Sequence, residues 1–577
     1  MPESFLRPWR LVLLVLTAVL CTATLAAAGN DERALQERDA PLRFEIVYPA
    51  DLDAGPLDGR LLLVIARTDR REPRFQVGWG LSTQPIFGVD VEGLRPGEPA
   101  VIDAGTRGYP VESIAEIPAG DYYVQAVLNV YTTFRRADGH TIKAHMDQWE
   151  GQQWNRSPGN LVSDVEHLHI DPASGEPLRI TLSEKIPPID PPEDTKYVKH
   201  IKFRSEILSE WWGHDIYLGA VVVLPEGFDE HPDARYPIAY MHGHFPRTFG
   251  FRQTPPDPQA TGRAREWAEA QYRFFQDWQS GALGRFIIVL MQHPTPYYDD
   301  SYAVNTENNG PYGDALTQEL MPRVERQFRA IGEPWARTLY GGSTGGWESL
   351  AWQVFYPDMF NGVWTFCPDP VDFRYFQLIN IYEDENAFHP NSDWVRTPMR
   401  PLMRGVDDQV YMTMMDLSHQ EAVLGSRGRS GGQLDIFMAV FGPVGEDGYP
   451  KLLYDKWTGE IDKSVVDYWR ENFDLRYILE RDWETLGPKL AGKIHVYMGD
   501  TDTFYLEEAA RLMERFLEST ADPYYDGRFE WGERQPHCYT GAPAFPGQSS
   551  HQRVLPLMLQ HILETSPPGA DTLSWRY

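Results

Sequence analysis

The stretch TLYGGSTGGWESLAWQVFYP, residues 338–357, decides the fold of this chain. It opens with a short apolar run and passes through four glycines that flank Ser343 and Thr344. It then continues with apolar residues at helical spacing until Pro357. A change from an extended to a helical pattern across a glycine-rich turn predicts a strand, a very tight turn and an α-helix.

Within this turn, Gly341, Ser343 and Gly345 have the spacing of a nucleophile elbow. Glycines two positions before and after the serine let the strand and the helix approach closely. The serine hydroxyl then stands above the sheet edge, and the Thr344 N–H at the helix N-terminus is aimed at an oxyanion beside it. The alternative is a glycine-rich loop with an incidental serine, because the chain has 48 glycines. The flanking strand and helix favour the elbow.

Length and composition narrow the class of protein. The chain has 577 residues, too many for one ordinary domain, and its apolar content of 42% is enough for large packed cores. The formal net charge is −30, and no basic stripe offsets it. We therefore expect no nucleic-acid partner.

The N-terminus has the layout of a secretory signal peptide. Arg7 and Arg10 precede an apolar run over residues 11–20, and small residues lead to Ala28. The alternative is an uncleaved membrane anchor, for which the run is short. We expect residues 1–28 to be removed, leaving a secreted or periplasmic protein with no stable membrane insertion.

The rest of the chain divides by pattern. Residues 29–186 show mostly period-two alternation punctuated by Gly and Pro, which predicts an all-β sandwich. Residues 187–198 form a proline-rich linker. Residues 199–577 alternate apolar strands with amphipathic helices, which predicts a mainly parallel sheet with helices on both faces. The alternation lapses over residues 376–489, a predicted insertion or cap.

An activated serine needs a base, and the base needs an orienting acid. The predicted strand 493–498 ends in Gly499, Asp500, Thr501 and Asp502, at the sheet edge that also carries Ser343. Either aspartate fits by position. We favour Asp502 as the acid, and Asp500 is the alternative. If Asp502 is the acid, we expect Asp500 to bind backbone N–H groups of the loop.

The base is expected after the last predicted strand. His537 is the histidine at that point, and it follows the acid in the chain order of serine, acid and histidine. His551 is the competitor, but it is predicted to open the final helix. We therefore assign His537 as the base.

A second oxyanion donor is expected from the loop that follows the predicted strand 236–241. This loop begins with His242, Gly243 and His244, and we expect the backbone N–H near His244 to donate. The two histidines resemble metal ligands by residue type. Since no aspartate or cysteine cluster accompanies them in the sequence, we expect no metal.

At this point the chain resembles a known family. Residues 199–565 are similar to the putative-esterase branch (esterase D and feruloyl-esterase-like) of the α/β-hydrolases. The motifs that carry the resemblance are the opening strands over 217–225 and 236–243 with their His-Gly turn, a Glu-Leu-x-Pro helix at 319–322, the Gly-x-Ser-x-Gly-Gly elbow at 341–346 and a Gly-x-x-Asp turn at 499–502. The last motif supports Asp502. The resemblance implies an α/β-hydrolase fold, here with a long insertion and an added N-terminal β domain.

Together these residues predict a secreted serine esterase that hydrolyses carboxylic esters through an acyl-enzyme. Ser343 is the predicted nucleophile, His537 the base and Asp502 the acid, with Thr344 and His244 as oxyanion donors. We expect no cofactor. The resemblance implies feruloyl or acetyl esters of polysaccharides as substrates.

Three alternatives stay open. A serine peptidase uses the same triad, although the propeller of the prolyl-oligopeptidase type would not fit in the N-terminal region. An acyltransferase shares every catalytic residue and differs only in its acceptor. From another class, the chain could be a non-catalytic carbohydrate-binding protein on a hydrolase scaffold, which the intact serine, acid and histidine argue against. The oligomeric state is not predicted.

Cys367 and Cys538 are the two cysteines left after signal-peptide removal. Cys367 follows the predicted strand 362–366, and Cys538 is the next residue after His537, so both lie at the same sheet edge. In an oxidising compartment this placement favours a disulfide, with two buried free thiols as the alternative.

Overall fold

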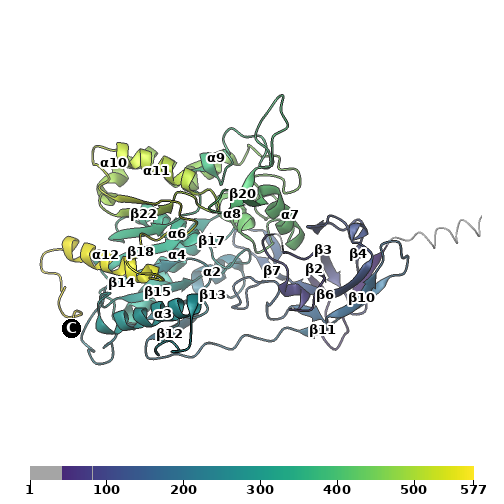
Figure 1. The fold of residues 1–577 in the computed structure, drawn as a ribbon, viewed down its shortest axis with the longest axis horizontal. Helices are drawn as coiled ribbons and strands as arrows, with labels where there is room; N and C mark the ends of the chain where they lie inside the picture. Colours follow the sequence, from purple (N-terminus) through teal and green to yellow (C-terminus); the bar gives the residue numbers. More distant parts are fainter. Residues whose placement is uncertain (1–41, 81) are drawn as a thin grey trace, which may run out of the picture.

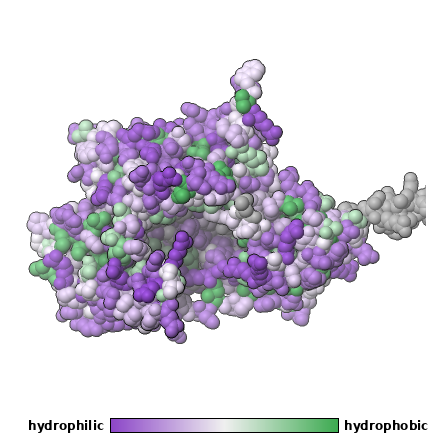
Figure 2. Space-filling model, viewed as in Figure 1, coloured by the Kyte–Doolittle hydropathy of each residue, from purple (hydrophilic) through white to green (hydrophobic). Residues whose placement is uncertain are grey.

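The computed structural model describes residues 42–80 and 82–577. The predicted signal peptide lies outside this range. Figure 1 shows a β region built from the first part of the chain at one end of the molecule and a larger α/β region at the other. The face shown in Figure 2 is largely hydrophilic and is hollowed between the two regions. Among the described residues, no helix combines the length and the apolar character needed to cross a bilayer.

The α/β region is built on an eight-stranded sheet with the order β12-β13-β15-β14-β18-β19-β22-β23. The β12–β13 and β13–β15 pairs are antiparallel, and every other pair is parallel. The mainly parallel sheet predicted from the sequence is therefore confirmed. The strands are β12 (Val198–Ser205), β13 (Ile216–Val223), β14 (Ile238–His242), β15 (Ile287–Gln292), β18 (Arg337–Gly342), β19 (Gly362–Phe366), β22 (Ile494–Gly499) and β23 (Arg528–Gly532).

Both faces of this sheet are buried, because successive strand residues point to opposite faces. In β15, Ile287 and Val289 belong to one core, whereas Ile288 and Leu290 belong to the other. Helices α3 (Gly262–Ser280) and α12 (Ser550–Thr565) supply side chains to the second core. Helices α5 (Met321–Gln327), α6 (Thr344–Phe355) and α10 (Leu475–Leu490) supply them to the first. A further helix, α11 (Glu507–Ser519), follows β22.

One predicted helix differs from the structure. Apolar residues spaced by four predict a helix over residues 314–330. The chain instead forms α4 (Tyr312–Ala315), a π-helical turn (Leu316–Leu320) and α5. Pro322 gives a physical reason, since it has no N–H to donate and its ring clashes with the preceding turn of an α-helix. The wider π-turn lies just before the proline.

The N-terminal region forms a nine-stranded sheet with the order β4-β1-β11-β9-β6-β2-β3-β5, in which β10 also pairs with β6. Its helical segments, within the described residues, are two 3-10 turns. Eight of these strands form one hydrogen-bonded path, and a separate hairpin consists of β7 (Thr132–Arg135) and β8 (Thr141–Ala144), so a sandwich of two sheets stays a prediction. The strands are β1 (Arg43–Val47), β2 (Leu57–Ala66), β3 (Ile86–Leu94), β4 (Ala100–Asp103), β5 (Gly108–Tyr109), β6 (Gly120–Val130), β9 (Leu161–Ser163), β10 (Glu166–Ile170) and β11 (Leu178–Lys185).

The insertion contacts both regions. It contains the hairpin β20 (Pro401–Arg404) and β21 (Val410–Thr413), then α7 (Met414–Leu424), α8 (Gln433–Phe441) and α9 (Val466–Phe473). Helix α7 lies beside β3 of the N-terminal sheet (Figure 1). Val423 of α7 packs in one buried cluster with Leu62 and Val64 of β2, and its carbonyl oxygen accepts hydrogen bonds of 2.7 and 3.0 Å from the Arg60 guanidinium.

Candidate active site

Ser343 lies at the junction of β18 and α6 in a backbone conformation that non-glycine residues rarely adopt, with φ 58° and ψ −124°. The turn is as tight as its glycines allow. A Cβ added at Gly341 would lie 2.2 Å from the Gly345 carbonyl oxygen, and one at Gly345 would lie 2.1 Å from the His242 carbonyl oxygen. Both glycines are therefore required for the close approach of strand, helix and neighbouring loop.

Three side chains form a continuous chain of hydrogen bonds at this edge of the sheet. The Asp502 Oδ2 atom lies 2.8 Å from Nδ1 of His537, and Nε2 of His537 lies 2.9 Å from the Ser343 hydroxyl oxygen. Asp502 follows β22, His537 follows β23 and Ser343 follows β18. Since these strands are parallel, their carboxyl ends bring the three residues to one place.

The two candidate acids have different surroundings. Asp502 is fully buried, and its Oδ1 atom accepts a hydrogen bond of 2.8 Å from the Phe504 N–H, which leaves Oδ2 for His537. Asp500 accepts hydrogen bonds from the Arg534 N–H and the Thr501 hydroxyl. Asp500 thus binds a backbone N–H, as the sequence suggested, but that N–H belongs to the neighbouring loop that carries His537.

The surroundings of His537 favour its protonated form. Burial lowers the pKa of this imidazole, but the charge of Asp502 and the hydrogen bond to it outweigh burial, so that the pKa is raised above its ordinary value. His551, the competing histidine, is the second residue of α12 and lies 3.0 Å from the Tyr340 hydroxyl through Nδ1. Its ring stacks on Phe274 of α3.

The two predicted oxyanion donors come from adjacent segments. Thr344 is the first residue of α6, so its N–H is one of the free donors at the helix N-terminus. The loop with His244 lies against the elbow, as the contact of Gly345 with His242 requires. His244, Gly341 and Gly342 line the same pocket.

A polar network that the sequence pattern does not predict adjoins the serine. An Asp369 carboxylate oxygen lies 3.5 Å from the Ser343 hydroxyl, and the other accepts hydrogen bonds from Tyr302 (2.5 Å) and Thr344 (3.1 Å). Burial raises the pKa of this carboxyl to about 6, against the lowering effect of the Tyr302 hydrogen bond. Gln433 of α8 donates to the Tyr302 hydroxyl, so the insertion contacts the elbow through this network. The sequence feature that could have indicated Asp369 is its position, because it follows β19 at the sheet edge that carries the catalytic residues.

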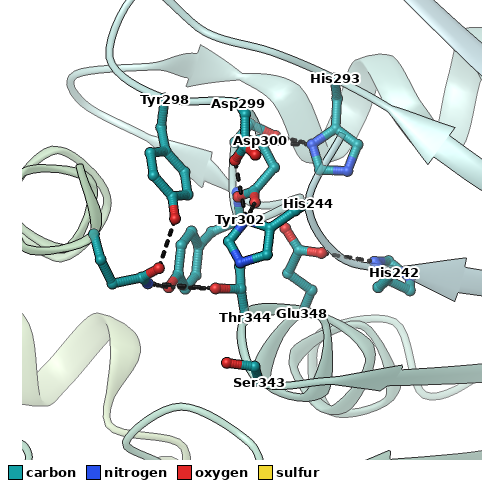
Figure 3. A network of polar contacts seen from close by, with 12 residues as sticks. His242, His244, His293, Tyr298, Asp299, Asp300, Tyr302, Ser343, Thr344 and Glu348 are labelled. Atoms are coloured by element: carbon teal, nitrogen blue, oxygen red, sulfur yellow. Dashed lines mark hydrogen bonds and ion pairs between the residues drawn. The ribbon is translucent and has the colours of Figure 1, made fainter. Parts of the chain in front are cut away.

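The structure also corrects the expectation that no aspartates accompany His244. Nδ1 of His244 lies 3.1 Å from Asp299 Oδ1 and 3.4 Å from Asp300 Oδ2 (Figure 3). The aspartates are distant in sequence, but they follow β15, which pairs in parallel with β14. The ends of neighbouring parallel strands meet at one edge, and this brings the histidine and the aspartates together.

Cys367 and Cys538 lie beside the catalytic edge with their sulfur atoms 2.7 Å apart. Both are free thiols in this structure. Their adjacency is as predicted from the strand ends, whereas the disulfide between them stays a prediction.

One family model matches part of this chain. Residues 218–408 match the family model described as "Putative esterase". No curated protein matches the chain. Solved structures similar to it include a ferulic acid esterase, with 15% identity over 63% of this chain and 99% of that chain and a TM-score of 0.33. Another is an S-formylglutathione hydrolase from Agrobacterium tumefaciens, with 13% identity over 64% of this chain and 97% of that chain and a TM-score of 0.31. A third is a ferulic acid esterase from Anaeromyces mucronatus, with 15% identity over 63% of this chain and 90% of that chain and a TM-score of 0.26.

Proposed function

We propose that this chain is a carboxylic ester hydrolase with Ser343, His537 and Asp502 as its catalytic triad, and the match of residues 218–408 to the putative-esterase family model supports this. The observation that carries the proposal is the continuous hydrogen-bond chain from Asp502 through His537 to the serine hydroxyl. The strained backbone of Ser343 at the start of α6 supports it further.

The mechanism follows from these contacts. Nε2 of His537 accepts the hydroxyl proton as Ser343 Oγ forms a bond to the ester carbonyl carbon. The Thr344 and His244 backbone N–H groups stabilise the resulting oxyanion. When the carbon–alkoxide bond breaks, His537 returns the proton to the leaving alcohol. Water then attacks the acyl-enzyme carbonyl while His537 accepts its proton, and the proton passes to Ser343 Oγ as the carboxylic acid leaves. Asp502 orients the imidazole and stabilises its charged form in both half-reactions.

We propose that the substrate is an ester with an aromatic or saccharide group, such as a feruloyl or acetyl ester of a polysaccharide. The support is a pair of rings beside the base. Phe504 meets the His537 ring edge-on at 4.8 Å between centroids, and Trp79 meets Phe504 edge-on at 6.3 Å. Trp79 belongs to the N-terminal region and is 51% exposed, so its ring is available for stacking.

The organisation around the site is part of the proposal. Residues 1–28 serve as a cleaved signal peptide of a secreted or periplasmic enzyme, residues 29–186 form a β-sandwich domain, and residues 376–489 form a cap. Residues 187–198 are a linker, in keeping with the lack of helix or strand over 186–197, all of which the structure describes. The contact of Gln433 with Tyr302 supports the cap.

The decisive experiment compares the chain with its Ser343→Ala variant. The wild type is expected to hydrolyse at least one ester in a panel of aryl, acetyl and feruloyl esters and to react with a fluorophosphonate probe. The variant is expected to lose both properties while its circular dichroism and melting temperature are retained. Undiminished turnover by the folded variant would contradict the proposal. Product analysis with added sugar acceptors separates hydrolysis from acyl transfer.

A further inference from the structure

A cluster of acidic side chains surrounds His244 next to the elbow. Asp299 and Asp300 follow β15, and Glu348 comes from α6, the helix that begins after Ser343. Glu348 is fully buried, and the side chains of Asp300 and Asp299 are 1% and 19% exposed. Figure 3 shows these carboxylates together with His244, whose imidazole points toward the two aspartates. The potential ligand atoms of His244, Asp299 and Asp300 all lie within 4.8 Å of one another.

Several oxygens in this cluster have no hydrogen-bond partner among the described residues. These are Oδ2 of Asp300 and both carboxylate oxygens of Glu348, all of them buried. Glu348 is directed toward the cluster, with its carboxylate drawn beside Asp300 and the His244 ring in Figure 3. Its other neighbour, His242, lies at 3.6 Å and makes no hydrogen bond through either ring nitrogen within the described part of the chain. Buried carboxylate oxygens without partners are costly, so such a group points to a cation.

The charge of the cluster points in the same direction. When ionised, the carboxylates of Asp299, Asp300 and Glu348 would together carry −3 in a largely buried place. In the described residues, no lysine or arginine forms an ion pair with Asp299, Asp300 or Glu348. His244 would bind a divalent ion as a neutral imidazole, with the Nδ1 proton released to solvent, and the ion would reduce this charge to −1.

We propose that Nδ1 of His244 and the carboxylates of Asp299 and Asp300 bind one divalent transition-metal ion, with Glu348 adding its negative charge from the buried side. The separations of 3.1 and 3.4 Å from Nδ1 to the two aspartate oxygens fit this. Atoms about 2.0–2.2 Å from one ion lie roughly 2.8–3.6 Å apart at angles between 90° and tetrahedral. One imidazole with carboxylates suits Zn²⁺ or Mn²⁺, whereas Ca²⁺ and Mg²⁺ prefer oxygen ligands alone. The half-exposed His244 leaves a path for the ion from solvent.

The consequence for the reaction rests on the proposed function, but the binding itself does not. His244 is the proposed oxyanion donor through its backbone N–H, and Glu348 lies on the elbow helix. An ion held by the His244 ring would fix the donor loop against that helix. His244, Asp299 and Asp300 would then act as positioning residues for the oxyanion site. Loss of the ion is therefore expected to lower kcat more than it changes KM.

The test uses the full chain after treatment with a chelator and dialysis. Metal analysis is expected to find about one equivalent of Zn²⁺ or Mn²⁺ after reloading, and the melting temperature should rise to saturation with either ion but not with Mg²⁺. Asp299→Asn and Asp300→Asn should each weaken binding at least about tenfold. The matched control is Asp121→Asn, which removes the partner of an exposed histidine, His169, 2.8 Å away. This variant should bind like the wild type.

Each outcome decides the proposal. If the wild type binds no stoichiometric metal, the carboxylates share protons instead and the metal site is overturned, even where ester hydrolysis is intact. If binding survives in both folded aspartate variants but is lost in Cys538→Ser, the ion lies at Cys367, His537 and Cys538, which also gather suitable ligand atoms. That result would likewise overturn the assignment. If one aspartate variant fails to fold, the other, checked by circular dichroism, carries the test.

Discussion

His537 and Ser343 lie 194 positions apart in the chain, yet the imidazole Nε2 and the serine oxygen are within 2.9 Å. Their contact is set by the sheet and not by either loop alone. The strands β18 and β23 each end at the same edge, separated in the sheet by β19 and β22. Substitutions of the residues that these strand ends bring together should therefore lower the reaction rate. Substitutions of other residues in the same loops should change only the local structure.

The acid can be identified by comparing two aspartates in one loop. Asp502→Asn is expected to lower kcat by about 10³–10⁴, because an amide cannot hold the histidine in its working tautomer or stabilise its charge. Asp500→Asn should cost far less, since Asp500 accepts hydrogen bonds from the Arg534 N–H and the Thr501 hydroxyl and not from the histidine. Steady-state kinetics on one ester measure both, and a reversed order of losses would move the role of the acid to Asp500.

The pH profile should report the histidine. The base must be neutral to accept the serine proton, and the pKa of His537 is raised by Asp502. Activity is therefore expected to fall with decreasing pH, with a midpoint above the ordinary value of about 6.5. The measurement is kcat/KM between pH 5 and pH 10 on a non-ionising ester. A flat profile over this range would be incompatible with a histidine base.

Trp79 should act on substrate choice and not on the chemical step. Trp79→Ala is expected to lower kcat/KM about 2- to 10-fold for feruloyl or saccharide esters, in line with a ring contact worth about 0.5–1.5 kcal/mol. A small aliphatic ester such as methyl acetate should be affected little. Trp267→Ala, at an exposed tryptophan of α3, is the matched control. Equal losses on every ester would indicate a structural effect and remove Trp79 from the binding surface.

Cys367 and Cys538 are expected to form a disulfide in protein isolated from an oxidising compartment. The bond would close a loop across 171 positions, which the chain-entropy model values at roughly 4–5 kcal/mol. Thiol counting under denaturing, non-reducing conditions should find none, and reduction should lower both the melting temperature and the activity, since Cys538 adjoins His537. Two free thiols in that sample would leave the cysteines as a buried reduced pair.

Much of the α/β region can be predicted from local pattern, because strands such as β15 are buried on both faces and are almost wholly apolar. The edge strand β12 escapes notice, since Lys199, Lys202 and Arg204 interrupt its apolar residues. The π-helical turn before Pro322 cannot be predicted from the 3.6-residue spacing of apolar residues, because that spacing indicates only an α-helix.

The residues of the site also differ in how well the sequence predicts them. The flanking glycines predict Ser343, and the strands that precede Asp502 and His537 predict these two residues. Asp369 and the pair Asp299 and Asp300 cannot be recognised in the same manner, because polar residues after a strand are ordinary loop residues until the neighbouring strand is known. Only the strand order shows that the two aspartates reach His244.

The packing of α7 on the N-terminal sheet has a consequence for synthesis. Leu62 and Val64 share a buried cluster with Val423, and Arg60 binds the Val423 carbonyl oxygen 363 positions later. At about 5–20 residues per second, the ribosome makes that partner roughly 20–70 s after the strand. During this interval Leu62 and Val64 lack the partner that covers them in the folded chain, and a chaperone could shield this apolar face of the nascent sheet.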